Sequence, residues 1–153
     1  MQTIARKGKL VLKDGSVYEG ELYGKRNAVG EVVFTTGMSG YQETLTDPSF
    51  CGQIVVMTYP LVGNYGTNDL FNQGRKSFFQ GYVISELCDH PSNWRCEKTL
   101  EQFLDEQDVP VLIRVRLPVN FAIMVYCRVL SCRQKCRRRK WKSCWLHQKY
   151  MIR

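Results

Sequence analysis

Two apolar, β-branched runs stand close together in the first half of the chain, separated by a polar connection. The first covers residues 31–35 (EVVFT) and the second covers residues 53–59 (QIVVMTY). Both have the length and composition of strands, and Pro60 ends the second run because proline has no N–H to give a sheet. The connection is rich in turn residues and in hydroxyl, amide and carboxyl side chains. The pattern predicts two strands that carry a shaped polar loop, and loops on rigid strands often hold functional residues.

Further strands and one helix are expected on either side of this block. They are a hairpin over residues 9–23 with its turn at Asp14-Gly15, a strand over 78–85, a helix over 97–107 and a strand that begins near Val109. Asp-Gly between two extended runs is a strong hairpin signal, and Leu100, Phe103 and Leu104 recur at helical spacing. These elements predict a small α/β domain.

The charge divides the chain into two parts. Residues 1–112 hold ten Lys or Arg and all 14 Asp or Glu, whereas residues 113–153 hold twelve Lys or Arg and no acid. The net charge of +8 therefore combines an acidic body, predicted to be one domain, with a basic tail. No apolar run has the length of a membrane span, and the first residues lack an apolar signal core. We therefore expect a protein of the cytoplasm or of an organelle matrix, with the cytoplasm as the preferred location, that does not enter a membrane.

The central block resembles a known family over a long stretch. Residues 31–69 read EVVFTTGMSGYQETLTDPSFCGQIVVMTYPLVGNYGTND. This run is similar to the N-terminal domain of the small subunit of glutamine-dependent carbamoyl phosphate synthetase, and a weaker similarity covers about residues 8–111. The resemblance implies a swivelling β/β/α layered domain over residues 1–112, mostly strands with a late helix. The disordered basic tail, residues 113–153, would follow it.

The resemblance also implies a function. Small subunits of this family dock to a large synthetase subunit, and their second half hydrolyses glutamine with a Cys-His-Glu arrangement. The ammonia is used to make carbamoyl phosphate for arginine and pyrimidine synthesis, and ATP and metal belong to the large subunit, so no cofactor is expected in this chain. In the motif Asp47-Pro48-Ser49, the serine would contact glutamine in the pocket of the other half. From the residues alone, a serine that caps its own turn is the simpler interpretation.

The residues show no glutaminase site of their own. A nucleophilic cysteine needs a base within hydrogen-bond reach and usually a strained turn, but no G-x-C-x-G occurs and His90 and His147 have no evident partner. Glu43 and Asp47 are interpreted as a solvated pair or a cap and not as catalytic carboxylates. We therefore expect no catalytic residue, no metal ligand and no glutaminase activity in the isolated chain.

Other polar residues of the block are interpreted as structural. Tyr41 and Gln42 are expected to be packing and hydrogen-bonding anchors of the loop. Residues 63–66 (GNYG) resemble a phosphate-binding turn only superficially, because no Lys-Ser/Thr follows them. Cys51, Cys88 and Cys96 have no metal-ligand spacing, and without a secretory signal a disulfide framework is not expected.

The tail departs from the family pattern. Where the family continues with a strand and an Asp-Thr-Arg segment, this chain has IRVRLPVN from residue 113. Back-translation of residues 114–128 in a shifted frame gives a family-like segment, so we interpret the tail as a frameshift after about Leu112 that leaves the glutaminase half missing. Arg114 and Arg116 would place cations in the last strand, and burying an unpaired guanidinium is costly. We expect this segment to leave the sheet.

The basic tail also leaves a second class of function open. Residues 137–142 (RRRKWK) combine cations with an aromatic ring, which suits phosphate contact and base stacking. The alternative is therefore a non-catalytic basic protein that binds nucleic acid, although a solvated tail is the preferred interpretation. Cys127, Cys132, Cys136 and Cys144 miss the usual C-x2-C spacing of zinc sites. Deleting residues 113–153 would abolish salt-sensitive binding by the tail but preserve docking by the body.

Overall fold

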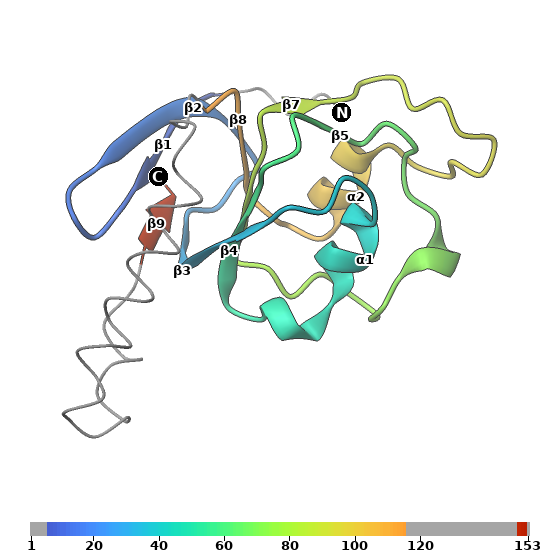
Figure 1. Cartoon of the computed structure of the whole chain (residues 1–153), viewed down its shortest axis with the longest axis horizontal. Coiled ribbons are helices and arrows are strands. Elements are labelled where there is room, and N and C mark those ends of the chain that lie inside the picture. The colour runs from blue at the N-terminus through green and yellow to red at the C-terminus, as the bar shows by residue number, and fades with distance from the viewer. Residues whose placement is uncertain (1–5, 116–149, 153) are drawn as a thin grey trace.

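The computed structural model describes residues 6–115 and 150–152. In chain order the elements are β1 (Arg6–Val11), β2 (Val17–Tyr23), β3 (Ala28–Thr35), α1 (Tyr41–Thr46), the 3-10 helix η1 (Pro48–Phe50), β4 (Gln53–Met57), β5 (Leu61–Val62), the 3-10 helix η2 (Asp69–Phe71), β6 (Gly81–Val83), β7 (Glu86–Leu87), α2 (Leu100–Glu106), β8 (Val111–Ile113) and β9 (Tyr150–Ile152). The larger sheet closes into a barrel in the order β1-β2-β8-β6-β4-β3-β9, and β5 pairs with β7. Both α-helices lie on one side of this barrel (Figure 1). This mixed α/β architecture, mostly strands, confirms the expected fold class.

The two apolar runs of the central block are neighbouring parallel strands. β3 and β4 pair in register from Glu31 opposite Gln53 to Thr35 opposite Met57. Parallel neighbours need a crossover connection, and here the crossover contains α1 and η1. The prediction of a shaped polar loop was therefore wrong for residues 41–46, which form a helix. The helix has only six residues, too few for hydrophobic periodicity to reveal it.

β4 is continuously apolar because it is buried on both faces. Ile54 and Val56 face the barrel interior, where they join a cluster that includes Leu112. Val55 and Met57 face the helices and belong to a second cluster, with members Tyr41, Leu45, Val62, Phe79, Tyr82, Ile84, Leu100, Phe103, Leu104, Val109, Val111 and Ile113. Strands buried on both faces lack the alternation of half-exposed strands. The crossover is thus anchored to the most buried strand of the domain.

The hairpin and the late helix form as expected. β1 and β2 pair antiparallel, and the Asp14 carboxylate accepts a hydrogen bond from the Ser16 backbone N–H at 3.0 Å across the turn. Helix α2 begins with a capping box, in which Thr99 and Gln102 each accept a hydrogen bond from the other's backbone N–H. The strand expected over residues 78–85 is shorter and covers only Gly81–Val83.

The expectation that Arg114 expels the last strand was wrong. β8 pairs with both β2 and β6, because the Arg114 side chain is 71% exposed and its Nη1 lies 2.8 Å from Glu21 Oε1. No buried, unpaired guanidinium arises at this position, and Val115 beyond it is buried.

Part of the tail also takes part in the sheet. Residues 150–152 form β9, which pairs with β1 and β3 and closes the barrel, so the expected disorder does not hold for these three residues. Arg116, the proposed nucleic-acid motif at 137–142 and the cysteines of the tail lie outside the described residues. Within the described ranges, no helix is both long enough and apolar enough to cross a membrane.

Candidate functional site

The turn that carries Ser49 lies on the surface immediately after α1. Asp47 caps η1, and its Oδ1 accepts a hydrogen bond from the Ser49 backbone N–H at 2.8 Å. This backbone hydrogen bond, followed by the hydroxyl of Ser49, lowers the pKa of Asp47, so its carboxylate remains charged and acts as a cap. Pro48 and Ser49 are both exposed. The turn therefore presents a serine at a fixed place on the molecular surface.

A pair of stacked tyrosines fixes the start of α1. The rings of Tyr41 and Tyr65 lie 4.1 Å apart between centroids, with an angle of 20° between their planes. The Tyr65 hydroxyl accepts from the backbone N–H groups of Gly40 and Tyr41 at 2.8 and 3.1 Å, and the Tyr41 hydroxyl donates to the Gly66 carbonyl at 2.6 Å. Burial raises the pKa of both tyrosines. Both therefore remain neutral hydrogen-bonding groups at physiological pH.

A buried amide connects α1 to the loop after β5. Gln42 is 1% exposed, and its Nε2 donates to the Asn68 carbonyl and to Asn72 Oδ1 at 2.5 and 2.7 Å. Its Oε1 accepts from the Asn68 N–H at 2.9 Å. Asn68 in turn donates through Nδ2 to the Arg95 carbonyl and to Glu97 Oε1, both at 2.9 Å. One helix is thus tied to two loops that are distant in the sequence.

The other end of α1 is held in the same way. Thr46 is buried, and its hydroxyl donates to the Gln42 carbonyl at 3.0 Å and accepts from the Gln73 N–H at 2.8 Å. Satisfied buried polar networks favour one arrangement, because any displacement leaves polar groups without partners. The exposed Ser49 turn is therefore mounted on a helix that is fixed at both ends. The expectation that Tyr41 and Gln42 anchor the loop is confirmed.

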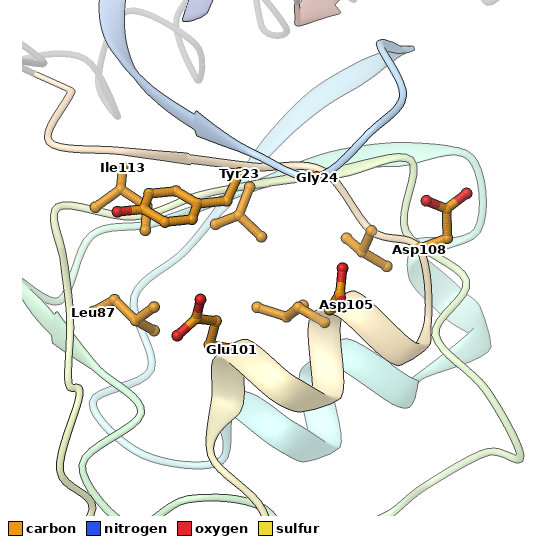
Figure 2. A pocket seen from close by; sticks show the side chains of 10 residues that line it. Tyr23, Gly24, Leu87, Glu101, Asp105, Asp108 and Ile113 are labelled. Carbon is orange, nitrogen blue, oxygen red and sulfur yellow. The ribbon is translucent and has the colours of Figure 1, made fainter. Parts of the chain in front are cut away.

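A second feature is a pocket between α2 and the edge of the barrel. Its lining residues are Tyr23, Gly24, Leu87, Glu101, Leu104, Asp105, Asp108, Val109, Val111 and Ile113. Figure 2 shows that Glu101 and Asp105 project from α2 toward the side of the pocket formed by Tyr23 and Gly24. Burial raises the pKa of Tyr23, and the charge of Glu21 raises it further. The phenol of Tyr23 therefore stays neutral where it lines the pocket. The pocket combines an apolar surface with carboxylates.

The remaining residues considered from the sequence do not form a catalytic group. Glu43 and Asp47 do not act as a pair, since the Asp47 carboxylate caps η1. His90 is exposed, and Cys51, Cys88 and Cys96 are free thiols. Within residues 6–115 and 150–152, no three His, Cys, Asp or Glu side chains gather in a way that could hold a metal ion.

Two groups of residues were missed by the sequence reasoning. Tyr65 and Asn68 were treated only as parts of a turn, although their dense spacing with glycine could have indicated a loop with a structural partner. Glu101 and Asp105 are four residues apart on a predicted helix, which places them on one helix face. That spacing was a usable signal, but the apolar wall opposite them comes from β2, β7 and β8 and could not be foreseen.

Comparison with known families and proteins identifies the family of this chain. The family model of the carbamoyl-phosphate synthase small chain, CPSase domain, matches residues 10–116. The chain belongs to this family, and its described body is the N-terminal domain of such a small chain. The match runs beyond Leu112, through β8 and the buried Val115.

Individual relatives agree with this assignment. The carbamoyl phosphate synthase small chain of Caldanaerobacter subterraneus subsp. tengcongensis is 57% identical over 107 residues, which are 69% of this chain and 30% of the relative. The pyrimidine-specific small chain of Bacillus subtilis is 52% identical over 107 residues, 69% of this chain and 29% of the relative. The small chain of Clostridium perfringens is 51% identical over 104 residues, 67% of this chain and 30% of the relative. The matched part of the chain therefore spans about 30% of the length of these relatives.

Proposed function

We propose that this chain supplies the N-terminal domain of a glutamine-hydrolysing carbamoyl phosphate synthase small chain. In this role it docks to the large chain and completes the glutamine site formed by the glutaminase half of a small chain. The large chain would bind ATP and metal, and the product would serve arginine and pyrimidine synthesis. A cytoplasmic location belongs to the proposal and agrees with the free thiols of Cys51, Cys88 and Cys96.

The observation that supports a role in the glutamine site is that the exposed Ser49 follows a rigidly held helix. An exposed serine gains no packing from its neighbours, yet the helix before it is held by the stacked tyrosines and by the buried Gln42. A rigid element that presents an exposed hydroxyl suits contact with a ligand held by another domain, because little entropy is lost on binding. A hydroxyl can both donate and accept, as the head group of an amino acid requires.

The glutamine contact can be tested in a chimera. Residues 10–116 of this chain would replace the matching segment of the Caldanaerobacter subterraneus small chain, and the product would be combined with the large chain of that organism. We expect glutamine-dependent carbamoyl phosphate synthesis. Ser49→Ala should raise the KM for glutamine about two- to tenfold, because one hydrogen bond contributes about 0.5–1.5 kcal/mol.

Ser39→Ala is the matched control for this experiment. Ser39 is also an exposed serine, but it lies on the loop before α1, so its removal should leave the KM for glutamine unchanged. Synthesis from added ammonia should be the same in both variants, because it bypasses the glutamine site. If Ser49→Ala and the parent chimera have the same KM for glutamine, the proposed contact between Ser49 and glutamine is wrong.

The isolated chain is expected to release no ammonia from glutamine. Its one exposed cysteine among the described residues, Cys51, belongs to the turn after η1 and has no base in hydrogen-bond contact, whereas a nucleophilic cysteine requires one. The measurement is ammonia release by the purified chain, with Cys51→Ala as the control. Ammonia release that disappears in Cys51→Ala would contradict the proposal that glutamine is hydrolysed by the glutaminase half and not by this chain.

A further inference from the structure

The first three residues of β3 depend on β9 for their place in the sheet. Within the described ranges, residues 28–30 pair with no strand other than β9, because the pairing of β3 with β4 begins at Glu31. β9 also pairs with residues 10–11 of β1, and it lies between β1 and β3 (Figure 1). We call the space between residues 10–11 and residues 28–30 the strand slot. An occupant of this slot pairs on both of its edges.

An empty strand slot would be unfavourable for two reasons. Its edges would present backbone N–H and C=O groups without partners, and such edges pair readily with other extended chains. The slot also lies beside the core of the barrel, where Leu10 and Ala28 are 0% and 1% exposed and belong to the same cluster as Leu112. A strand in the slot therefore provides partners for the backbone and keeps water away from this cluster.

The strand that fills the slot comes from outside the family domain. The family model matches residues 10–116, whereas β9 covers Tyr150–Ile152. β9 has only three residues, which pair with two residues of β1 and three residues of β3. Such a contact resembles the binding of a short extended peptide at a sheet edge, in which main-chain hydrogen bonds provide the affinity. β9 therefore has the character of a bound segment as much as that of a barrel strand.

We propose that the strand slot is an acceptor site for an extended segment, and that residues 150–152 of the same chain occupy it as an internal ligand. The slot receives this ligand antiparallel to both β1 and β3. Residues 116–149 tether the ligand to the body, and tethering typically gives an effective concentration of about 1 mM. Occupation by the same chain therefore requires a Kd below about 1 mM for the untethered segment. This role does not depend on carbamoyl phosphate synthesis.

The first test compares Met151→Pro with the parent in the full 153-residue chain. Proline cannot donate a backbone hydrogen bond and does not fit between two paired strands, so the slot should open. Amide hydrogen exchange over residues 28–30 should accelerate about tenfold or more, and by more than exchange over residues 54–56 of β4. The matched control is Met38→Pro on the exposed loop before α1, which should not accelerate exchange over residues 28–30 selectively. Equal acceleration over residues 28–30 and 54–56 in Met151→Pro, or none, would overturn the proposal.

The second test supplies the ligand as a separate peptide. A synthetic peptide with the sequence of residues 147–153 (HQKYMIR) is added to the Met151→Pro chain at about 5 mM, which exceeds the limit set on the Kd by the tether. It should restore slow exchange over residues 28–30, whereas the same peptide with the Met151→Pro change should not. The parent chain should respond to neither peptide, because its slot is filled. If HQKYMIR restores no protection in the Met151→Pro chain, the slot is not an acceptor site.

A measurement on the parent chain keeps the proposal testable if Met151→Pro does not fold. Val29 and Met151 are register partners, so nuclear Overhauser contacts between their backbone protons should appear at about 50 µM protein, far below the effective concentration of the tether. Co-refolded labelled and unlabelled chains distinguish contacts within one chain from contacts between two copies. Contacts within one chain support the proposal. Their absence, or contacts only between copies in a dimer, would overturn the assignment of residues 150–152 as an internal ligand.

Discussion

Gly66→Ala should destabilise the domain by about 2–5 kcal/mol. Gly66 has φ +68°, where a Cβ costs about 1–2 kcal/mol. That Cβ would also overlap Cys96 Sγ and lie 2.9 Å from the Lys98 carbonyl oxygen, and overpacking of this kind costs about 1–3 kcal/mol more. The Lys98 carbonyl cannot withdraw easily, because it accepts the Thr67 backbone N–H at 2.9 Å. Urea unfolding would measure the change in the free energy of unfolding. Thermal unfolding should show a Tm that is lower by about 10 °C or more.

Gly15→Ala separates the two causes of this loss. Gly15 has φ +87°, but no atom lies within 4 Å of the position its Cβ would take. Its replacement should therefore cost only the conformational term, about 1–2 kcal/mol. If both variants lose the same stability, the close approach of the loops at residues 66 and 96–98 contributes nothing, and the packing described for this region is incorrect.

The parts of the fold that follow from local physics were predictable. The Asp14-Gly15 turn and the spacing of Leu100, Phe103 and Leu104 are local signals, and they gave the hairpin and α2. β4 could be identified because it is buried on both faces and is therefore apolar at every position from Ile54 to Met57. In each case a short segment contains the information that determines its structure.

The remaining parts depend on contacts between distant segments. Gln42 meets Asn68 across 26 residues, and no local pattern indicates such a pairing. The pocket likewise joins β2, β7, β8 and α2, so only the spacing of Glu101 and Asp105 was visible in the sequence. Arg114 is a further example, because its effect on the sheet depends on a distant residue. Its guanidinium reaches Glu21, and the sequence alone did not show that Glu21 lies beside it.

Both interpretations of Ser49 are compatible with the structure. Its backbone N–H bonds to Asp47, as expected of a turn serine, while the residue itself remains exposed. A backbone cap fixes the turn, and a fixed turn determines where the side chain points. The structural role thus supports the proposed glutamine contact, and anything that loosens α1 should also loosen the Ser49 turn.

Gln42→Leu is therefore expected to affect both stability and the turn. Leucine retains the volume but leaves the Asn68 N–H, the Asn68 carbonyl and Asn72 Oδ1 without the partner that Gln42 provides. Each buried polar group without a partner costs about 1–3 kcal/mol. The Asn68 carbonyl still accepts a hydrogen bond from the Phe71 N–H at 3.1 Å and Asn72 is only half-buried, so we expect a total of about 1–3 kcal/mol in urea unfolding. Hydrogen exchange should accelerate over residues 40–52, because this segment loses its attachment to the loop at Asn68.

Gln53→Leu provides the matched control for this last prediction. Gln53 is half-buried on β4, and its side chain makes one hydrogen bond, to Glu31 Oε2 at 3.1 Å. The same substitution there should cost less than about 1 kcal/mol, because water can replace a partner at a partly exposed site. In Gln42→Leu, exchange in the β1–β2 hairpin should accelerate less than exchange at residues 40–52, since Gln42 does not contact the hairpin. If Gln42→Leu accelerates exchange equally in the hairpin and at residues 40–52, the buried amide stabilises the whole domain and does not position the Ser49 turn.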